Sequence, residues 1–401
     1  MNTTESKPES TPEFAPEATL ATAPESRPEF APEATLASAP EATPATAPEP
    51  TPDYDAIIIG GSYAGLSGAL QLARARRRIL VIDAGQRRNR FASNSHGFLT
   101  RDGQPAASIA AEGRANVAAY PNVAWHDGTA SSARRDGDGF VVELDGAGTV
   151  RGARLVLATG VRDELPQIDG LAERWGKSVF HCPYCHGYEL NEGRIGVLAS
   201  GPMSVHQAQM LPHWGQVTLF TNGVCPLDAA QLADLHARGV QVDDTPVLRL
   251  VNVATVVLED GRQEIMTGLF TFGRLHMASP IAEQLGCAFD AGPIGPFIRT
   301  DDTRQTTVPG VFAAGDGMRA ASSVALSVAD GAMAGVGAHR SLLFGLAPFG
   351  APFGAPVAAQ IPASVVPPVV SPVAAPLLPQ PCPQRRVSRH RRSYRAGRPD
   401  S

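Results

Sequence analysis

The sequence lacks the features that would place it in several large classes of protein. Its N-terminus has no basic region followed by an apolar run, so we expect no secretory signal peptide. The Val-rich stretch near residues 361–378 is interrupted by prolines, which argues against a membrane-spanning helix there. Five cysteines among 401 residues do not form the disulfide framework of a small secreted protein. We therefore predict a cytoplasmic protein without membrane contact.

Metal-ligand spacings are also missing. Cys182 and Cys185 form a CxxC pair within FHCPYCHGYE, but no second CxxC and no HxxxH pattern accompanies them. Structural zinc needs four ligands at suitable spacings, so we predict no metal site. A purely structural disulfide is disfavoured in a reducing compartment. The pair is therefore interpreted as a redox dithiol, because CxxC pairs form disulfides readily and a neighbouring positive charge can lower a thiol pKa.

The two ends of the chain do not have the composition of a folded domain. Residues 1–52 contain a near-repeat, PEFAPEATLATAPES and then PEFAPEATLASAPEA, built mostly from Pro, Ala, Glu and Thr. Residues 345–401 are rich in Pro, Ala and Val and end in an Arg-rich tail. Neither segment can bury a core, so both are predicted to be disordered. The Arg cluster is unpatterned, so we expect a solvated tail and no nucleic-acid partner.

The stretch DYDAIIIGGSYAGLSGALQLARARRRILVIDAG predicts a strand, a glycine-rich turn, a helix and a second strand. We expect strands at 55–59 and 79–82 and a helix at 66–76. The turn has the spacing of a dinucleotide-binding fingerprint, in which a helix N-terminus faces a pyrophosphate. The predicted cofactor-binding residues here are Gly60, Gly61, Ser62, Gly65 and Asp83.

Each of these residue types has a physical reason to be there. Gly60 permits the tight turn, and Gly65 lets the helix pack close to the strand. Ser62 replaces the middle glycine of the pattern with another small residue. Asp83 ends the second strand, where a carboxylate accepts hydrogen bonds from the ribose hydroxyls of the adenosine. The complete unit predicts a dinucleotide site.

A second marker lies far along the chain, in TTVPGVFAAGDGMRAASSVALSVADGAMAG. It predicts a strand at 311–313, then Gly315 and Asp316, then a small-residue helix from Ser322. This arrangement resembles the closing element of the FAD domain in flavoproteins with two dinucleotide-binding domains. The resemblance adds Gly315, Asp316 and Ala321 to the predicted cofactor-binding residues, with the helix N-terminus directed at the flavin.

Two FAD elements so far apart imply one FAD domain in two pieces with a second domain inserted between them. The insert contains its own strand, turn and helix in GRIGVLASGPMSVHQAQMLPHW, but Ala199 and Ser204 stand at the first and last glycine positions of the turn. No Arg cluster and no acid follow the next strand, at 217–220, to bind a ribose or its phosphate. We predict an α/β fold with two Rossmann-like domains. The predicted segments are a disordered region at 1–52, a first FAD-binding segment at 53–164, an inserted NAD(P)-binding-like domain at 165–276, a second FAD-binding segment at 277–344 and a disordered tail at 345–401.

With these motifs in this order, the sequence resembles the low-molecular-weight thioredoxin reductases over about residues 53–343. The resemblance implies FAD as cofactor, a homodimer, and two domains that rotate relative to each other. It also implies that Cys182 is the cysteine that meets the substrate and that Cys185 faces the flavin. His186 is predicted to carry the proton that thiol and thiolate exchange, so the predicted catalytic residues are Cys182, Cys185 and His186.

Two departures move the sequence toward one subgroup. Thioredoxin reductases usually have Asp after the second cysteine, where this chain has His186, and they carry an intact NADPH fingerprint. The chain is thus more similar to the small-molecule dithiol oxidases of the gliotoxin and holomycin type, which pass electrons from a dithiol through FAD to oxygen. We predict an FAD-dependent thiol–disulfide oxidoreductase that acts on a small dithiol or disulfide or on a thioredoxin-like protein.

Three alternatives stay open. In the first, NADPH or NADH reduces the flavin and the enzyme is a thioredoxin-disulfide reductase. In the second, the protein is a non-catalytic redox sensor that binds flavin, although such a protein would have no need of the CPYC pair. In the third, it is a flavin oxidase whose turnover does not involve Cys182 and Cys185.

Overall fold

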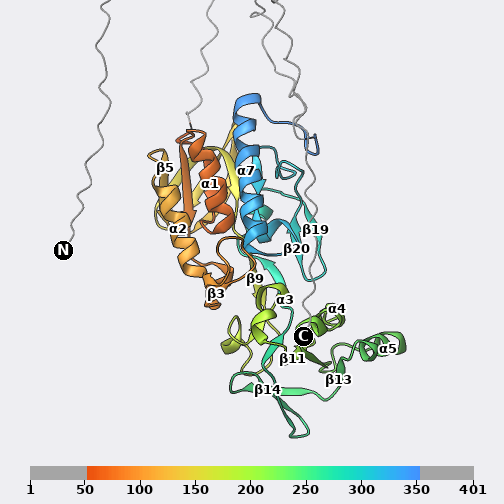
Figure 1. Ribbon diagram of the computed structural model, residues 1–401. Helices are drawn as coiled ribbons and strands as arrows, with labels where there is room; N and C mark the ends of the chain where they lie inside the picture. The colour runs from red at the N-terminus through yellow and green to blue at the C-terminus, as the bar shows by residue number, and fades with distance from the viewer. Residues whose placement is uncertain (1–51, 353–401) are drawn as a thin grey trace, which may run out of the picture. The chain divides into compact units, whose positions relative to one another are not determined.

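The computed structural model describes residues 52–352 (Figure 1). Two predicted disordered segments lie mostly outside this range. They are residues 1–51 at the N-terminal end and residues 353–401 of the predicted tail. The first eight residues of that tail, 345–352, do lie within it and contact the preceding domain. Gln305 donates a hydrogen bond to the carbonyl of Ala347, and the backbone N–H of Gly350 donates to Asp301. The boundary of the tail at residue 345 stays a prediction.

The chain forms strands and helices in alternation, as the α/β prediction requires. The strands are β1 Tyr54–Ile59, β2 Ile79–Asp83, β3 Asn94–Ser95, β4 Gln104–Pro105, β5 Val123–Asp127, β6 Ala130–Asp136, β7 Gly139–Leu144, β8 Gly148–Leu157, β9 Val161–Glu164, β10 Val179–Phe180, β11 Arg194–Leu198, β12 Gln216–Phe220, β13 Gln241–Asp243, β14 Val247–Val251, β15 Thr255–Leu258, β16 Gln263–Ile265, β17 Gly268–Phe270, β18 Arg274–Met277, β19 Phe289–Ala291, β20 Pro296–Ile298 and β21 Val311–Ala313. The α-helices are α1 Tyr63–Arg74, α2 Ala106–Ala118, α3 Pro183–His186, α4 Met203–Met210, α5 Ala229–Ala237, α6 Ile281–Gln284 and α7 Val324–Phe344. The short 3₁₀ helices are η1 Arg88–Phe91, η2 Ala172–Arg174, η3 Tyr188–Leu190, η4 Leu211–His213 and η5 Gly315–Met318.

One sheet joins the two predicted FAD segments. Its strand order is β5-β2-β1-β8-β7-β6, and β21 from the far end of the chain pairs in parallel with β8. Strands β5, β2, β1 and β8 are also parallel, whereas β7 and β6 are antiparallel to their neighbours. The central strand β1 is apolar on both faces and buried from Ala56 to Ile59, as expected for a parallel strand covered on both sides. We call this unit the core domain.

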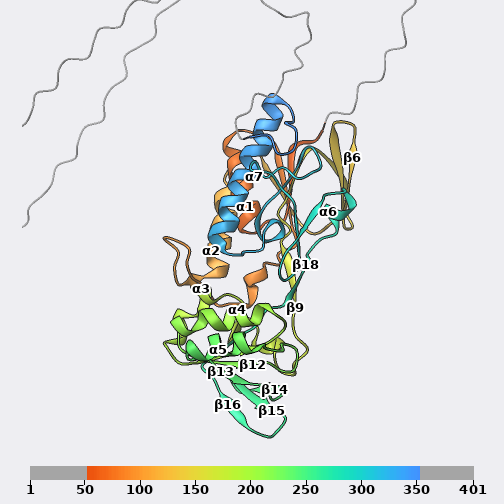
Figure 2. The same cartoon turned by 90° about the vertical axis from the view of Figure 1, so that its right-hand side faces the viewer.

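Helices α1 and α7 pack side by side on the core domain (Figures 1 and 2). Glycines at the contact allow the two backbones to approach closely. A Cβ atom at Gly331 would lie 2.0 Å from the carbonyl oxygen of Ala64, and one at Gly335 would lie 2.6 Å from that of Gly68. The helix that follows the first turn is therefore tied to the helix that follows the second FAD marker.

Helix boundaries differ from the sequence-based prediction by a few residues. Helix α1 begins at Tyr63 instead of residue 66 and ends at Arg74, because Arg76 has a left-handed φ of 59° that ends the helix. Helix α7 begins at Val324 instead of Ser322. Ser323 is its N-cap, and the hydroxyl of Ser323 accepts a hydrogen bond from the N–H of Leu326.

A second parallel sheet, ordered β10-β17-β11-β12-β13, lies within the segment that we predicted as an insert. Strands β14 to β16, which come between β13 and β17 in the chain, form a separate antiparallel sheet. Figure 2 shows α4 and α5 beside the strands of this unit, which we call the inserted domain. The antiparallel pair β9 and β18 connects it to the core domain, with Val161 opposite Met277 and Glu164 opposite Arg274. The α/β class and the two-domain organisation are confirmed, and the boundaries at 165 and 276 stay a prediction.

No helix within residues 52–352 is long and apolar enough to cross a bilayer.

Candidate active site

The glycine-rich turn between β1 and α1 has the shape that the fingerprint predicts. Gly60 has a φ of 104°, and a Cβ atom there would lie 2.2 Å from the carbonyl oxygen of Ala158. A Cβ atom at Gly65 would lie 1.7 Å from the carbonyl oxygen of Gly60. Only glycine fits either position, so the N-terminus of α1 begins directly at the turn. Ser62 is the N-cap residue, but its side chain does not cap the helix, which leaves the helix N-terminus available to an anion.

Asp83 lies at the carboxyl end of β2 and faces this turn. Its Oδ1 accepts a hydrogen bond of 3.1 Å from the backbone N–H of Gly61. A carboxylate can accept several hydrogen bonds, so Asp83 retains acceptor capacity for ribose hydroxyls. A Cβ atom at Gly61 would lie 2.7 Å from the Cβ of Asp83 and from the ring of Trp125, so this glycine is also required by space.

The second predicted FAD segment meets the first one here. Gly315 follows β21 with a φ of 79°, and a Cβ atom on it would lie 2.9 Å from the Cβ of Ala64 in the first turn of α1. Asp316 accepts a hydrogen bond from Ser327 of α7. Ala321 is exposed in the segment between η5 and α7, close to the helix N-terminus that Ser323 caps. The structure thus brings Gly60, Gly65, Gly315 and Asp316 to one end of the α1 and α7 pair.

Arg88 links several carboxylate and hydroxyl groups of this region, although the sequence analysis did not identify it. Its guanidinium makes hydrogen bonds of 2.8 and 2.6 Å with the two carboxylate oxygens of Asp163, which lies in β9. It also donates to Asp316 at 2.8 Å and to the hydroxyl of Ser322 at 2.9 Å. Burial disfavours the charge of Arg88, but the hydrogen bonds and charges of Asp163 and Asp316 outweigh it and raise the pKa of Arg88. No local motif marks this arginine, because its partners come from remote strands.

The cysteine pair lies at the start of the inserted domain. Cys182 follows β10 as the N-cap of α3, Pro183 occupies the first helical position, and Cys185 lies within the helix. The two cysteines form a disulfide with a Cα–Cα distance of 5.3 Å. Both are partly exposed, which suits a pair that must react with an external thiol. Gln207 of α4 donates a hydrogen bond of 2.9 Å to the carbonyl of His181 and so fixes the residue before the pair.

Two histidines flank the disulfide, one on each side. The ring of His186 stacks on Phe180 with a centroid distance of 4.3 Å, and burial, together with the charge of His96, lowers the pKa of His186 to about 4. The ring of His181 lies edge-on to Phe272 at 5.0 Å. Burial, followed by the charge of Arg88, lowers the pKa of His181 to about 4. Both imidazoles are therefore neutral near pH 7 and can accept a proton.

Each of these histidines has a buried Nδ1 atom without a hydrogen-bond partner among the described residues. Sequence reasoning selected His186 and passed over His181, which has no motif of its own. The charges of Arg88, Asp163 and Asp316 all act on His181, so the redox segment and the second FAD segment share one electrostatic environment. The proton-carrying role of His186 stays a prediction.

The turn between β11 and α4 has a different character from the first turn. The hydroxyl of Ser204, which is fully buried, accepts a hydrogen bond of 3.0 Å from the backbone N–H of Ser200. At the end of β12, Asn222 accepts a hydrogen bond of 2.7 Å from the N–H of Val247. The N–H of Ser200 and the side-chain oxygen of Asn222 are therefore already hydrogen-bonded within the protein. Ala199 and Ser204, on which the sequence-based prediction of an altered nucleotide-binding turn depends, lie directly after β11 and in the first turn of α4.

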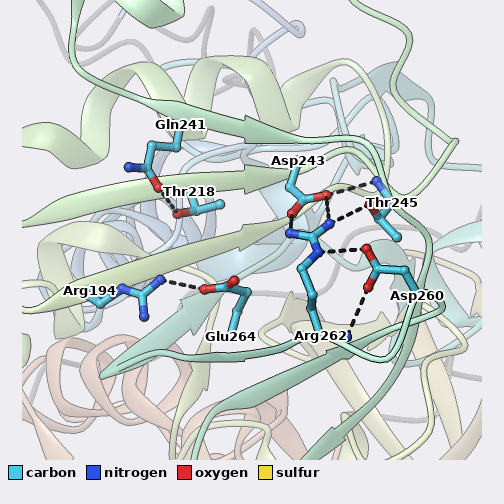
Figure 3. A network of polar contacts seen from close by, with 8 residues as sticks. All are labelled: Arg194, Thr218, Gln241, Asp243, Thr245, Asp260, Arg262 and Glu264. Carbon is cyan, nitrogen blue, oxygen red and sulfur yellow. Dashed lines mark hydrogen bonds and ion pairs between the residues drawn. The ribbon is translucent and has the colours of Figure 1, made fainter.

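Carboxylates neutralise two arginines of the inserted domain (Figure 3). Arg262 donates hydrogen bonds to Asp243 at 2.6 Å and to Asp260 at 2.6 Å, and Arg194 forms an ion pair of 2.6 Å with Glu264. The hydrogen bond from Arg262 holds the pKa of Asp243 below its usual range. These arginines are committed to internal partners and do not form a cluster that would bind a phosphate group.

The core domain contains the elements that an FAD molecule requires. The first turn has no room for a Cβ atom at its glycines, and the helix N-terminus behind it offers N–H groups. Asp83 accepts a hydrogen bond from this turn, and Asp316 follows β21 of the second FAD segment. The side-chain oxygen of Asn89 is buried without a partner among the described residues, so it can accept a hydrogen bond from a ligand. Within residues 52–352 no group of three or more His, Cys, Asp or Glu residues could hold a metal ion.

Comparison with known proteins agrees with this geometry. Residues 54–334 match the family model described as pyridine nucleotide-disulphide oxidoreductase. The thioredoxin reductase tcpT of Claviceps purpurea is 33% identical over 305 residues, which cover 72% of this chain and 94% of that protein. The thioredoxin reductase sirT of Leptosphaeria maculans is 32% identical over 307 residues, covering 71% and 93% of the two chains.

A solved structure shows the same fold at higher identity. The crystal structure of an oxidoreductase from Agrobacterium tumefaciens is 55% identical and superposes with a TM-score of 0.71, covering 73% of this chain and 99% of that one. The chain therefore belongs to the pyridine nucleotide-disulphide oxidoreductase family, as an FAD-dependent thiol–disulfide oxidoreductase of the thioredoxin reductase type.

Proposed function

We propose that this enzyme is a dithiol oxidase: it closes a small dithiol into a disulfide and passes the electrons through the Cys182–Cys185 pair and FAD to oxygen. The observation that carries the oxidase direction is the Ser204 hydroxyl, which occupies the N–H of Ser200 in the turn where a nicotinamide cofactor would place its pyrophosphate. Without a nicotinamide cofactor, electrons must enter through the thiol substrate.

The chemistry of the pair follows from thiol–disulfide exchange. A substrate thiolate attacks the sulfur of Cys182, a mixed disulfide forms, and the Cys182–Cys185 bond breaks with Cys185 leaving as a thiolate. The second substrate thiol then attacks the mixed disulfide, which releases Cys182 and closes the substrate disulfide. The imidazole of His186, in the same turn as Cys185, would accept a proton from a thiol, and its lowered pKa keeps it neutral near pH 7. The pair ends as a dithiol, and the substrate has lost two electrons and two protons.

The adenosine and pyrophosphate of FAD would be held by Gly60, Gly61, Ser62, Gly65 and Asp83. Gly315 and Asp316 would hold its ribityl or pyrophosphate region, and Ala321 lies near the helix N-terminus that would face the flavin ring. When bound, FAD supplies the acceptor for the two electrons of the Cys182–Cys185 dithiol. Arg88 would keep Asp316 in place through their ion pair.

The side chains around the disulfide favour a small substrate with an apolar body. Tyr184, between the two cysteines, is 72% exposed and lies edge-on to Trp214 at 5.4 Å. Tyr188 is 86% exposed two residues after His186. Exposed aromatic side chains bind apolar ligand surface at a low entropic cost. We further propose that the enzyme is a cytoplasmic homodimer.

The second candidate is an NAD(P)H-dependent thioredoxin-disulfide reductase, which the names of the curated relatives favour. An anaerobic titration of the purified, flavin-loaded protein distinguishes the two. We expect dithiothreitol to bleach the flavin absorbance, whereas NADPH and NADH leave it unchanged over the same time. Rapid bleaching by either nicotinamide cofactor would overturn the oxidase proposal and favour the reductase.

A further inference from the structure

His96 of the core domain reaches across to the redox turn of the inserted domain. It stands at the start of the loop 96–103, which the short antiparallel pair β3 and β4 closes. The Nδ1 of His96 lies 3.1 Å from the Oε1 of Glu189, three residues after His186. The ring of His96 also lies edge-on to that of His186, with a centroid distance of 6.4 Å and an interplanar angle of 71°.

The loop that carries His96 is fixed by hydrogen bonds to the first FAD-binding segment of the chain. Asp102 accepts a hydrogen bond of 2.8 Å from the N–H of Gly97 and closes the loop beneath His96. Tyr63, the first residue of α1, donates to the carbonyl of Ala106, which follows β4 directly. Asn89 in turn donates to the hydroxyl of Tyr63. His96 is thus held in position relative to the dinucleotide turn.

The covalent connection between the domains runs only through β9 and β18 in the described region of the chain, so non-covalent contacts must hold the redox turn against the core domain. A second such contact lies nearby. Gly176 of the inserted domain has a φ of 73°, and a Cβ atom on it would lie 2.7 Å from the Cβ of Phe91 in η1. Phe91 and His96 therefore contact the inserted domain from one short segment of the core domain.

We propose that His96 is a positioning residue for the redox pair: through Glu189 and His186 it holds the turn that carries Cys182 and Cys185 against the core domain. The side chain of His96 is 17% exposed and that of Glu189 is 39% exposed, so the contact between them is partly shielded from solvent. The ring of His186 packs between those of Phe180 and His96. Because His186 and Cys185 belong to the same short helix, this contact with His96 also fixes the position of Cys185. Asp102, 3.8 Å from the same nitrogen of His96, is the other carboxylate that faces it.

The inference refines the site on which the proposed function rests, but its test does not require oxidase activity. The variants His96→Gln, Glu189→Gln and the double variant are purified with FAD, reduced with dithiothreitol, freed of it and treated with iodoacetamide under anaerobic conditions. The alkylation rates of Cys182 and Cys185 are measured by mass spectrometry. Exposed His206→Gln and Glu192→Gln serve as controls, since both residues lie in the inserted domain outside this group.

Loss of the contact between His96 and Glu189 should free the turn and raise the alkylation rate about two- to fivefold in each single variant, the range expected for a partly exposed polar pair. The double variant should react no faster than the faster single variant, because both changes remove the same contact. The control variants should react at the rate of the unchanged protein. Steady-state oxidation of a dithiol, with the rate divided by the concentration of bound flavin, should show a lower kcat in His96→Gln and an unaltered KM. Division by bound flavin removes the effect of a smaller folded fraction, which would also lower the apparent kcat.

Unchanged alkylation rates in both single variants would overturn the proposal, as would rates that multiply in the double variant. These outcomes are independent of the direction of electron flow. If NADPH bleaches the flavin while His96→Gln still accelerates alkylation, the oxidase proposal fails and the positioning role stands. If only dithiothreitol bleaches the flavin and the alkylation rates do not move, the positioning role alone fails.

Discussion

Arg88 and Asp316 form an ion pair of 2.8 Å although 228 positions separate them in the sequence. The same guanidinium binds both carboxylate oxygens of Asp163, so one cation serves two carboxylates. The Asp163 side chain is only 6% exposed and that of Asp316 is 16% exposed. Arg88 therefore joins the loop after β2, the connecting strand β9 and the second FAD segment.

Replacing Arg88 by Met should leave two carboxylates partly buried without their cation. Removing one partner of a buried pair costs about 3 kcal/mol in free energy of unfolding, and urea denaturation of the flavin-free protein measures it. Equilibrium dialysis should also show weaker FAD binding. Arg299→Met is the matched control, because its partner Asp290 is exposed, and it should change stability much less. Equal losses in the two variants would contradict the role assigned to Arg88.

Cys182→Ser should abolish reduction of the flavin by dithiols, with a rate loss of at least about a hundredfold, because the Cys182–Cys185 disulfide that the substrate thiolate attacks can no longer form. Anaerobic stopped-flow absorbance with dithiothreitol measures this rate. Cys225→Ser is the control, since Cys225 is a free, buried cysteine that packs in the core of the inserted domain. Unchanged flavin reduction in Cys182→Ser would remove the pair from the reaction and leave a flavin oxidase that does not use it.

Sequence reasoning found the features of the fold and site that depend on neighbouring residues. Gly60, Gly65 and Asp83 lie within one strand–turn–helix–strand unit whose pattern dictates its geometry, and strand β21 has the predicted bounds, Val311–Ala313. The helix starts were missed by up to three residues, because backbone capping at Ser62 and Ser323 is decided by local geometry.

Residues whose partners come from remote elements could not be found in this way. Arg88, His96 and His181 carry no motif of their own, and each acquires its surroundings only when segments remote in the sequence meet. The insertion itself was predictable, because two FAD markers at opposite ends of the core leave no other arrangement. The contacts between the domains were not, since they depend on how the ladder of β9 and β18 places the inserted domain.

Gly65→Ala should prevent FAD binding or folding, because its Cβ atom would lie 1.7 Å from the carbonyl oxygen of Gly60. The first turn of α1 would have to move away from β1, and the pyrophosphate site would open. The yield of yellow soluble protein and its ratio of flavin to protein absorbance report the result. Gly113→Ala in α2 is the control: its Cβ atom would meet only the flexible end of Leu66 at 3.0 Å, and alanine favours a helix. A flavin-loaded Gly65→Ala protein would contradict the tight turn.

Acid should destabilise the flavin-free protein through His181 and His186, whose pKa values burial lowers to about 4. Between pH 6.5 and 4 each histidine binds a proton in the unfolded chain but not in the folded one, so the free energy of unfolding falls as the pH falls. The contribution of each is on the order of 1.4 kcal/mol per pH unit within this window and vanishes above it. Urea denaturation at intervals from about pH 4 to about pH 8 measures the slope.

In His186→Gln the slope of the free energy of unfolding against pH should decrease by the contribution of one histidine. Tyr184→Phe is the control in the same turn: it leaves both imidazoles in place, so the slope should not change. A slope in His186→Gln equal to that of the unchanged protein would mean that His186 is not buried as a neutral imidazole.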